Sequence, residues 1–172
     1  MENITIRKIE ERDNPVIAGI IRQTLKEFGA ARPGTVYYDD TTDALYQLFT
    51  GTPRSAYFIA EKDGKLLGGG GIFPTKGLPE DTCELVKMYL LPEARGLGLG
   101  RKLIQQSLDF AQQIGFKKVY LETMPELKQA LKAYEKLGFV YLDKALGESG
   151  HFGCDLWMLK SLGNVEQGPH LR

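Results

Sequence analysis

The sequence predicts an α/β fold in which one mixed β-sheet carries helices on both faces. The order of the elements supports this prediction, because runs of strands come first and a strand–loop–helix–strand segment follows. The apolar periodicity supports it as well, since the longer helical segments are amphipathic. A sheet between two layers of amphipathic helices accounts for both observations.

The first half of the chain is predicted to contain three strands and two helices. Residues 3–9 alternate as a strand does, and residues 15–28 place apolar side chains at helical spacing with Pro15 in the first turn. The dipeptide Asp63-Gly64 is typical of a hairpin turn. We therefore expect strands at 3–9, 56–61 and 65–73, and helices at 15–28 and 43–49, the second helix capped by Thr41, Thr42 or Asp43.

Glycines interrupt the second strand of this hairpin. Residues 68–71 are four consecutive glycines, which indicate a bulge or a close approach between backbones. Loops are expected before and after the hairpin, at 29–40 and 74–81.

A second strand–helix unit follows the hairpin. The strand-forming residues 85–91 stop at Pro92, and apolar residues at helical spacing begin at Leu99. Alternation along the strand predicts that Glu84, Val86, Met88 and Leu90 share one face, with Leu85, Lys87 and Tyr89 on the other. Beyond it we expect strands at 117–123, 140–143 and 153–159, and a helix at 126–137.

Length and charge limit the class of protein. At 172 residues, 42% of them hydrophobic, the chain has the size and composition of one domain, which we expect to span residues 1–162 with a frayed tail at 163–172. The 22 basic and 22 acidic residues cancel, which argues against binding to nucleic acid or to an anionic membrane. The chain has no apolar run of transmembrane length and no signal-peptide pattern, so we expect a cytoplasmic protein.

The cysteines and histidines predict no metal site. Cys83 and Cys154 provide neither a disulfide framework nor metal-ligand spacing, and His151 and His170 do not complete one. His151 could be a base or an acceptor-site residue, and Cys154 could be a nucleophile or a buried strand residue.

The segment from Arg95 to Lys102 is the strongest functional signal. Alternating glycines between a strand and a helix let a ligand approach the free amides of the first helical turn, and flanking cations favour an anion such as a pyrophosphate. A Walker A loop is unlikely because no Gly-Lys-Ser or Gly-Lys-Thr is present. A dinucleotide fingerprint lacks its last glycine, which is Arg101 here, although Glu122 stands where a ribose-binding acid is expected. The pattern Arg-x-x-Gly-x-Gly is complete in Arg95, Gly98 and Gly100.

Two stretches resemble one superfamily. ELVKMYLLPEARGLGLGRK, at residues 84–102, resembles the acetyl-CoA-binding motif of the GNAT N-acetyltransferases, and ALKAYEKLGF, at 130–139, resembles their next helix and strand. The resemblance implies a mostly antiparallel sheet whose splayed middle strands hold the pantetheine. It also implies acetyl-CoA as acyl donor, bound by Met88, Tyr89, Leu90, Arg95, Gly96, Leu97, Gly98, Leu99, Gly100, Arg101 and Lys102.

Acetyl transfer to an amine needs a base and a proton donor for the leaving thiolate. The resemblance makes Glu84 the first candidate base, acting directly or through water, and Glu122 the second; a strand-end glutamate paired with a cation is the alternative for Glu84. Tyr134 is the candidate acid, with core packing as its alternative. An asparagine that many relatives carry seven residues before this tyrosine is Leu127 here, and an amide near Leu90 is the expected oxyanion donor.

The sequence therefore predicts an acetyl-CoA-dependent N-acetyltransferase that modifies a primary amine of a small molecule or peptide by direct attack in a ternary complex. Two alternatives remain: a catalytically silent acyl-CoA-binding module and a nicotinamide-dependent oxidoreductase. Loops at 29–40, 74–81 and 144–153 are expected to enclose the acceptor, with acids and aromatics that suit a cationic amine. The oligomeric state stays open, and a homodimer is one alternative.

Overall fold

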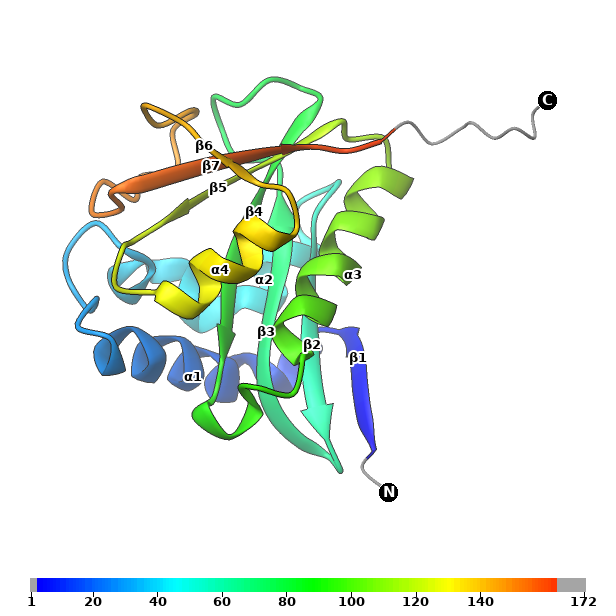
Figure 1. The fold of residues 1–172 in the computed structure, drawn as a ribbon. Helices are drawn as coiled ribbons and strands as arrows, with labels where there is room; N and C mark the ends of the chain where they lie inside the picture. Colours follow the sequence, from blue (N-terminus) through cyan, green and yellow to red (C-terminus); the bar gives the residue numbers. More distant parts are fainter. Residues whose placement is uncertain (1–2, 164–172) are drawn as a thin grey trace.

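The computed structural model describes residues 3–163, which form one seven-stranded sheet with helices on both sides (Figure 1). The spatial order of the strands is β1-β2-β3-β4-β5-β7-β6. The strands are β1 (Ile4–Lys8), β2 (Ala56–Lys62), β3 (Lys65–Phe73), β4 (Thr82–Leu90), β5 (Lys118–Thr123), β6 (Val140–Tyr141) and β7 (Leu156–Ser161). The helices are α1 (Asn14–Glu27), α2 (Leu45–Thr50), α3 (Leu99–Gln113) and α4 (Lys128–Lys136), with short 3₁₀ helices η1 (Glu11–Asp13), η2 (Val36–Tyr38), η3 (Asp40–Ala44) and η4 (Pro92–Ala94).

The predicted elements are all present, with several of their ends shifted. The helix expected at 43–49 begins at Leu45, and its N-cap is Ala44 instead of Thr41, Thr42 or Asp43. The helix expected at 126–137 begins at Lys128, and the strand expected at 153–159 is β7, which begins at Leu156. The strand expected at 140–143 is reduced to the two residues of β6. The tail predicted at 163–172 lies, from residue 164 onward, outside the described residues.

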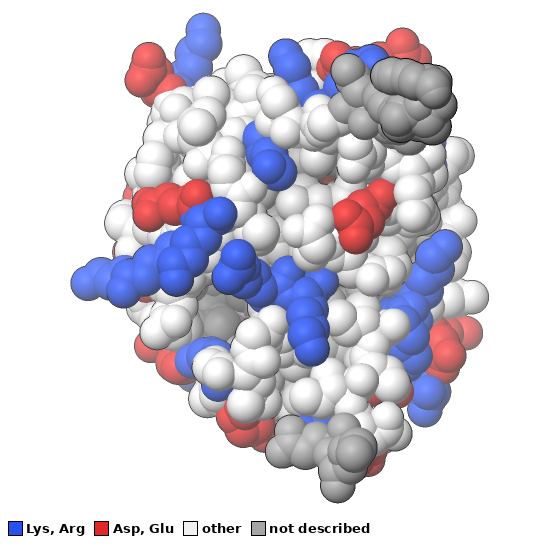
Figure 2. Space-filling model, turned by 45° about the vertical axis from the view of Figure 1, so that its right-hand side comes forward, with Lys and Arg blue, Asp and Glu red and all other residues white. Residues whose placement is uncertain are grey.

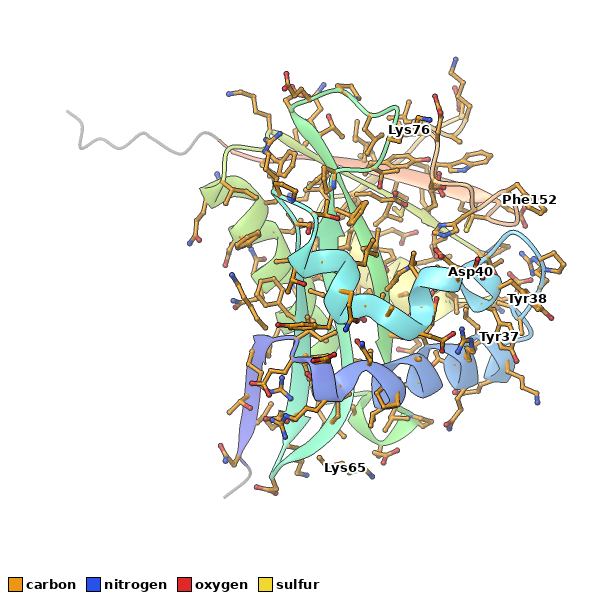
Figure 3. All side chains as sticks on the ribbon, turned by 180° about the vertical axis from the view of Figure 1, so that it is seen from behind. Tyr37, Tyr38, Asp40, Lys65, Lys76 and Phe152 are labelled. Carbon is orange, nitrogen blue, oxygen red and sulfur yellow. The ribbon has the colours of Figure 1, made fainter. Side chains whose placement is uncertain are left out.

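Two helical layers cover opposite faces of the sheet. Apolar residues of α1 and α2 pack with Tyr57 and Ile59 of β2, whereas α3 packs against the neighbouring residues Phe58 and Ala60. Because successive strand residues point to opposite faces, these contacts place α1 and α2 on one side and α3 on the other. Figure 3, seen from behind, shows α1 and α2 in front of the sheet that α3 and α4 cover in Figure 1. No helix in the described part of the chain has the length and apolar character needed to cross a membrane.

The four glycines of β3 allow its neighbours to approach very closely. A Cβ atom at Gly71 would lie 2.1 Å from the carbonyl oxygen of Ala56, and one at Gly68 would lie 2.2 Å from that of Tyr89. The register of β3 with β4 also shifts between Gly69 and Gly71. Both features predicted for this stretch, a bulge and a close backbone approach, are therefore confirmed.

The bulge corrects one prediction about β4. Lys87, at the bulge, has a φ of 53°, and the side-chain alternation changes there. Val86 and Tyr89 pack with the core on the α1 side, whereas Leu85 and Met88 pack with the core on the α3 side. The prediction that Met88 and Leu90 share a face with Glu84 was therefore wrong, because an inserted residue reverses the alternation beyond it.

The middle of the sheet opens between β4 and β5. These two strands are parallel and pair only from Thr82 to Glu84, opposite Lys118 to Tyr120, while the other neighbouring strands pair antiparallel. Figure 1 shows β4 and β5 diverging beyond this short ladder. The mostly antiparallel sheet with splayed middle strands is thus confirmed, and the gap between its strands begins at Glu84.

Candidate active site

A cleft of about 350 Å³ lies where β4 and β5 separate. Its walls come from β4, η4, the glycine loop, the start of α3, the end of β5 and α4. Helix α1 contributes Thr24, and Phe28, the residue that follows the helix, also lines the cleft. Beyond Glu84 the backbone of β4 no longer pairs with β5, so its amides and carbonyls on that side are available to an extended ligand.

The glycine loop ends directly at the first residue of α3. Gly96 and Gly98 have φ values of 80° and 75°, and Gly98 is the N-cap of the helix. A Cβ at either glycine would meet no protein atom within 4 Å, so both face open space. The left-handed backbone and the open approach leave the first amides of α3 facing the cleft, which is a suitable geometry for a phosphate group.

The cations of this region have different surroundings. The guanidinium of Arg95 lines the cleft but is held by Glu27 at 2.6 and 2.9 Å and by the carbonyl of Leu90 at 3.0 Å. Arg101 lines the cleft together with Lys132 and Lys136 of α4. Figure 2 shows Lys and Arg side chains gathered across the middle of the face it presents.

Not every residue of the predicted cofactor segment lines the cleft. Met88, Tyr89, Leu90, Arg95, Gly96, Gly98, Leu99, Gly100 and Arg101 line it, and Leu97 and Lys102 do not. Leu97 is 46% exposed. Leu97 stands inside the loop between two glycines and Lys102 in the first turns of α3, so their place in the sequence motif does not by itself make them part of the cleft.

Tyr134 of α4 is buried and lines the cleft. Its ring packs edge-on against Phe139, and burial raises the pKa of its phenol well above the usual value. Among residues 3–163 its hydroxyl has no hydrogen-bond partner. A phenol of this kind remains protonated at neutral pH and is free to donate to a group in the cleft.

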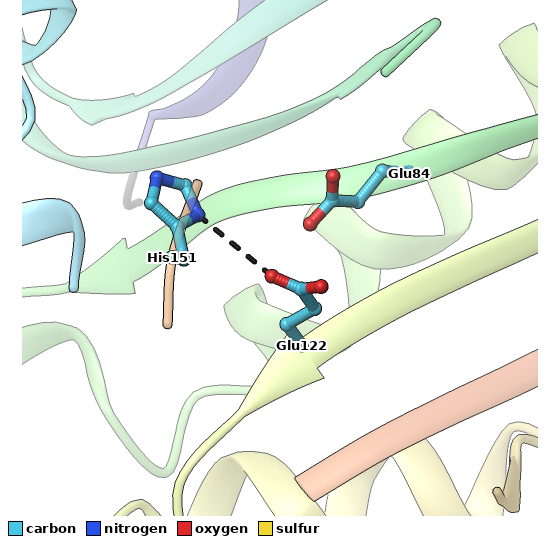
Figure 4. A group of neighbouring side chains, drawn as sticks. All are labelled: Glu84, Glu122 and His151. Carbon is cyan, nitrogen blue, oxygen red and sulfur yellow. Dashed lines mark ion pairs between the residues drawn. The ribbon is translucent and has the colours of Figure 1, made fainter. Parts of the chain in front are cut away.

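A second, much smaller cavity of about 30 Å³ adjoins the cleft and contains the carboxylate pair. The two cavities share six lining residues, which are Leu85, Lys87, Tyr89, Glu122, Thr123 and Leu127. Glu84 from β4 and Glu122 from β5 point toward one another across the smaller cavity (Figure 4). Burial and then the charge of Glu122 raise the pKa of Glu84 to about 7, although Thr75 donates a hydrogen bond to it at 2.6 Å.

The two glutamates differ in their hydrogen bonds. Both oxygens of Glu122 accept a hydrogen bond, one from the hydroxyl of Tyr120 at 2.7 Å and one from that of Ser149. Glu122 is therefore fixed in position by two hydrogen bonds, whereas the pKa of Glu84 is raised to about 7. Glu84 is therefore suited to proton transfer, and Glu122 helps to set the pKa of Glu84.

Two loops bring further charged groups to the smaller cavity. His151 Nε2 lies 3.0 Å from Asp39 Oδ2, and its Nδ1 lies 4.0 Å from Glu122 Oε1, the pair dashed in Figure 4. Lys87 Nζ lies 3.3 Å from the same Asp39 oxygen. Burial opposes ionisation of Asp39, but hydrogen bonds from His151 and Thr41 and the charge of Lys87 outweigh it, and the pKa of Asp39 falls well below its usual value.

The cysteines are poor nucleophiles in this structure. Cys154 is buried and lines the smaller cavity, and burial followed by the charges of Glu122 and Glu84 raises the pKa of its thiol to about 12. Burial also raises the pKa of Cys83 to about 12. The thiolate that a covalent acetyl-enzyme needs is therefore disfavoured at both positions.

The structure brings together residues that the sequence pattern did not connect. Atoms of Glu84, Glu122 and His151 that could bind a cation lie within 4.8 Å of one another, a set that suits a divalent ion or an ammonium group. Lys87 was missed as a site residue, because its approach to the cavity depends on the bulge of β4. Asp39 belongs to the loop at 29–40, whose acids were expected to face the acceptor. Two sequence signals were available. Glu84 begins the stretch that resembles the acetyl-CoA-binding motif, and His151 lies in a Gly-His-Phe-Gly stretch.

Comparisons with known proteins agree with the fold. Residues 21–139 match the model of the acetyltransferase (GNAT) family. The Escherichia coli (strain K12) protein named uncharacterized N-acetyltransferase YjgM is 45% identical over 158 residues, which cover 91% of this chain and 94% of that protein.

Solved structures share the fold at low sequence identity. A GNAT acetyltransferase from Staphylococcus aureus Mu50 superposes with a TM-score of 0.78 at 16% identity and covers 94% of this chain and all of its own, 100%. A phosphinothricin acetyltransferase from Sinorhizobium meliloti, solved with acetyl-CoA, superposes with a TM-score of 0.72 at 18% identity. The match covers 96% of this chain and 92% of that chain. Given the match over residues 21–139 and the relative at 45% identity, this chain belongs to the acetyltransferase (GNAT) family and is an N-acetyltransferase.

Proposed function

We propose that the protein transfers the acetyl group of acetyl-CoA to a primary amine of a small molecule or peptide, by direct attack in a ternary complex. The observation that carries this proposal is the junction of the two cavities. The cleft suits an extended phosphorylated cofactor, and the carboxylate pair lies beside it where the sheet opens. The neighbour solved with acetyl-CoA has the same fold and supports acetyl-CoA as the donor.

The glycine loop and β4 bind the donor in this scheme. The first amides of α3, with Arg101, Lys132 and Lys136 nearby, bind the pyrophosphate. The pantetheine pairs with the backbone of β4 beyond Glu84, where β5 no longer does. The thioester then lies near the carboxylate pair, and an amide near Leu90 stabilises the oxyanion.

Acetyl transfer then needs three proton movements. Glu84 takes a proton from the ammonium group of the acceptor, directly or through one water, and the neutral amine attacks the thioester carbonyl. The nitrogen of the tetrahedral intermediate loses its second proton to water, which later restores the proton of Tyr134, and the carbon–sulfur bond breaks when the intermediate collapses. Tyr134 donates its phenolic proton to the departing thiolate of CoA, which would otherwise leave as an anion in an apolar cleft.

Calorimetry and steady-state kinetics test the proposal. Acetyl-CoA should bind with a micromolar Kd while NADH should not bind, and initial rates with varied acetyl-CoA and amine should give intersecting lines. Binding of NADH without acetyl-CoA would support the oxidoreductase instead. Binding of acetyl-CoA with no thiol release for any amine would support a silent binding module, and parallel lines with an acetylated Cys154 would support a covalent route.

Three further properties of the protein stay predictions from the sequence. These are a single domain over residues 1–162, a cytoplasmic location and the choice between a monomer and a homodimer.

A further inference from the structure

Lys87 is a buried cation whose hydrogen-bonding capacity is only partly used. Its side chain is 5% exposed, and it lines both the cleft and the smaller cavity. An ammonium group has three N–H donors. Among the residues that the structure describes, Lys87 Nζ meets one acceptor, Asp39 Oδ2 at 3.3 Å, and that oxygen is also 3.0 Å from His151. Two donors of Lys87 are therefore left for a ligand.

The fold holds Lys87 in this place at a cost. A left-handed backbone is unfavourable for a residue other than glycine, and Lys87 has a φ of 53°. The hydroxyl of Tyr57 donates to the Lys87 carbonyl at 2.6 Å and fixes the bulge from the α1 side of the sheet. A bulge commonly redirects a side chain beside an active site, and here it directs a lysine to the cavity of the carboxylate pair.

The charges around the smaller cavity are arranged as a pair of opposite poles. Glu84 and Glu122 form the negative pole, with His151 Nδ1 4.0 Å from Glu122, and Lys87, which is paired with Asp39, forms the positive pole. The charge of Lys87 is close enough to lower the pKa of Glu84 and so to oppose the effect of burial there. A ligand that carries both an ammonium group and a carboxylate would match both poles.

The two loops above this cavity are fastened to one another. The amide of Gly153 donates to the carbonyl of Gly34 at 2.7 Å, and Arg32 bonds to the carbonyl of Gly153 at 3.2 Å and to Asp155 at 3.3 Å. With the His151–Asp39 contact, these bonds join segment 32–39 to segment 151–155. The smaller cavity measures about 30 Å³ and continues into the cleft, so it can take the charged head of a small acceptor but not a long peptide segment.

We propose that the acceptor is a small amino acid-like zwitterion, whose ammonium group binds at Glu84 and Glu122 and whose carboxylate binds Lys87. This inference rests on the proposed function for the reaction, but the binding of the zwitterion does not. The carboxylate completes the donors of a buried lysine, and the ammonium group lies where deprotonation by Glu84 leads to attack on the thioester. Lys87 therefore sets specificity, and the carboxylate pair performs the proton transfer.

Calorimetry on the CoA-loaded protein tests binding without any need for turnover. The probes are the twenty protein amino acids and, for each one that binds, the corresponding amide and decarboxylated amine. We expect at least one amino acid to bind at least tenfold more tightly than its amide and its amine. In Lys87→Met this preference should fall to within twofold, and Lys87→Arg should retain part of it.

Matched measurements separate this inference from loss of the fold. Lys65→Met removes an exposed lysine at the other end of the sheet (Figure 3) and should keep the full preference. Lys87→Met should keep its thermal midpoint within a few degrees and its affinity for CoA within threefold. No amino acid binding better than its amide, or an unchanged preference in Lys87→Met, would overturn the inference. Turnover of amines without amino acid binding would overturn it and leave the proposed function intact, whereas tight amino acid binding without acetyl transfer would do the reverse.

Discussion

At Glu84, burial and a neighbouring negative charge act on the carboxyl group in the same direction. Together they raise its pKa to about 7, against a usual value of 4.5, and the opposing effects of Thr75, His151 and Lys87 are smaller. A base must be ionised to accept a proton, and it is ionised above its pKa. The pKa of Glu84 therefore places the working range of the enzyme at and above neutral pH.

The pH dependence of the rate should report this group. With acetyl-CoA saturating, kcat/KM for the acceptor should rise as pH increases through about 7, because the protonated and inactive form of Glu84 is lost there. In Glu84→Gln the rate should fall by about 10²–10⁴-fold, the usual range for a general base, and this limb should disappear. An unchanged pH profile in Glu84→Gln would transfer the role to Glu122 or to water alone.

Replacing Tyr134 with phenylalanine should separate chemistry from packing. Its hydroxyl has no hydrogen-bond partner within residues 3–163, so its removal leaves no partner unpaired and the free energy of unfolding should change by less than about 1 kcal/mol. We expect kcat to fall by about 10–100-fold while the Kd for acetyl-CoA stays within threefold, because the proton is needed only when the thiolate forms. A lower thermal midpoint with normal kcat would mean that Tyr134 only packs in the core.

The sequence pattern found these residues more readily than their partners. Glu84 and Tyr134 each lie in a contiguous stretch that resembles a family motif, so both could be identified as candidates from the sequence. Asp39 and His151 are separated by 112 positions and meet only when two loops close over the sheet. The position of Lys87 at the cavity could not be predicted, because its direction depends on the bulge and strict side-chain alternation does not include one.

At the scale of elements, the glycine loop and the start of α3 form one unit. Gly98 at the N-terminal end of α3 and Gly115 just after its C-terminal end both have positive φ values, 75° and 102°, and a Cβ at either would meet no protein atom within 4 Å. Alanine at either position should therefore destabilise the fold by a similar amount, about 1–2 kcal/mol for a left-handed residue. Only Gly98 lies in the cleft.

This pair gives a matched test of the anion site. Gly98→Ala should weaken acetyl-CoA binding at least tenfold in calorimetry, because its methyl group occupies the approach to the helix amides. Gly115→Ala should bind acetyl-CoA as the unchanged protein does, despite a similar loss in thermal midpoint. Equal affinities in the two variants would contradict the role of the loop.

The glycines of β3 allow a second comparison, this one of stability. A Cβ at Gly71 would lie 2.1 Å from a backbone oxygen, whereas one at Gly70 would lie 2.2 Å from the flexible end of Met88. Overpacking of this kind costs about 1–3 kcal/mol, and we expect Gly71→Ala at or above the top of that range in urea unfolding and Gly70→Ala below its middle. A larger loss for Gly70→Ala would mean that the close approach of β2 to β3 is not what requires glycine.

At the scale of the whole molecule, the order of elements was predictable and their ends were less so. The long amphipathic helices and the Asp63-Gly64 hairpin carry strong local signals, and they occur where they were expected. The splayed strands were implied by resemblance, because no local pattern says that pairing between β4 and β5 stops at Glu84. Strand β6 is only two residues long because its pairing is set by β7, which lies fifteen or more positions away in sequence.

The central claim is that the site between β4 and β5, where the sheet opens, catalyses direct acetyl transfer to an amine. Thiol release from acetyl-CoA, measured at pH 8 across amino acids, polyamines, aminoglycosides and peptide N-termini, tests it most directly, with mass spectrometry of the acceptor product. The account predicts equal amounts of free CoA and N-acetylated product for at least one amine, and a loss of at least about 10²-fold in Glu84→Gln. Acetyl-CoA that binds but yields no N-acetylated product from any acceptor, or a Glu84→Gln variant with full activity, would contradict it.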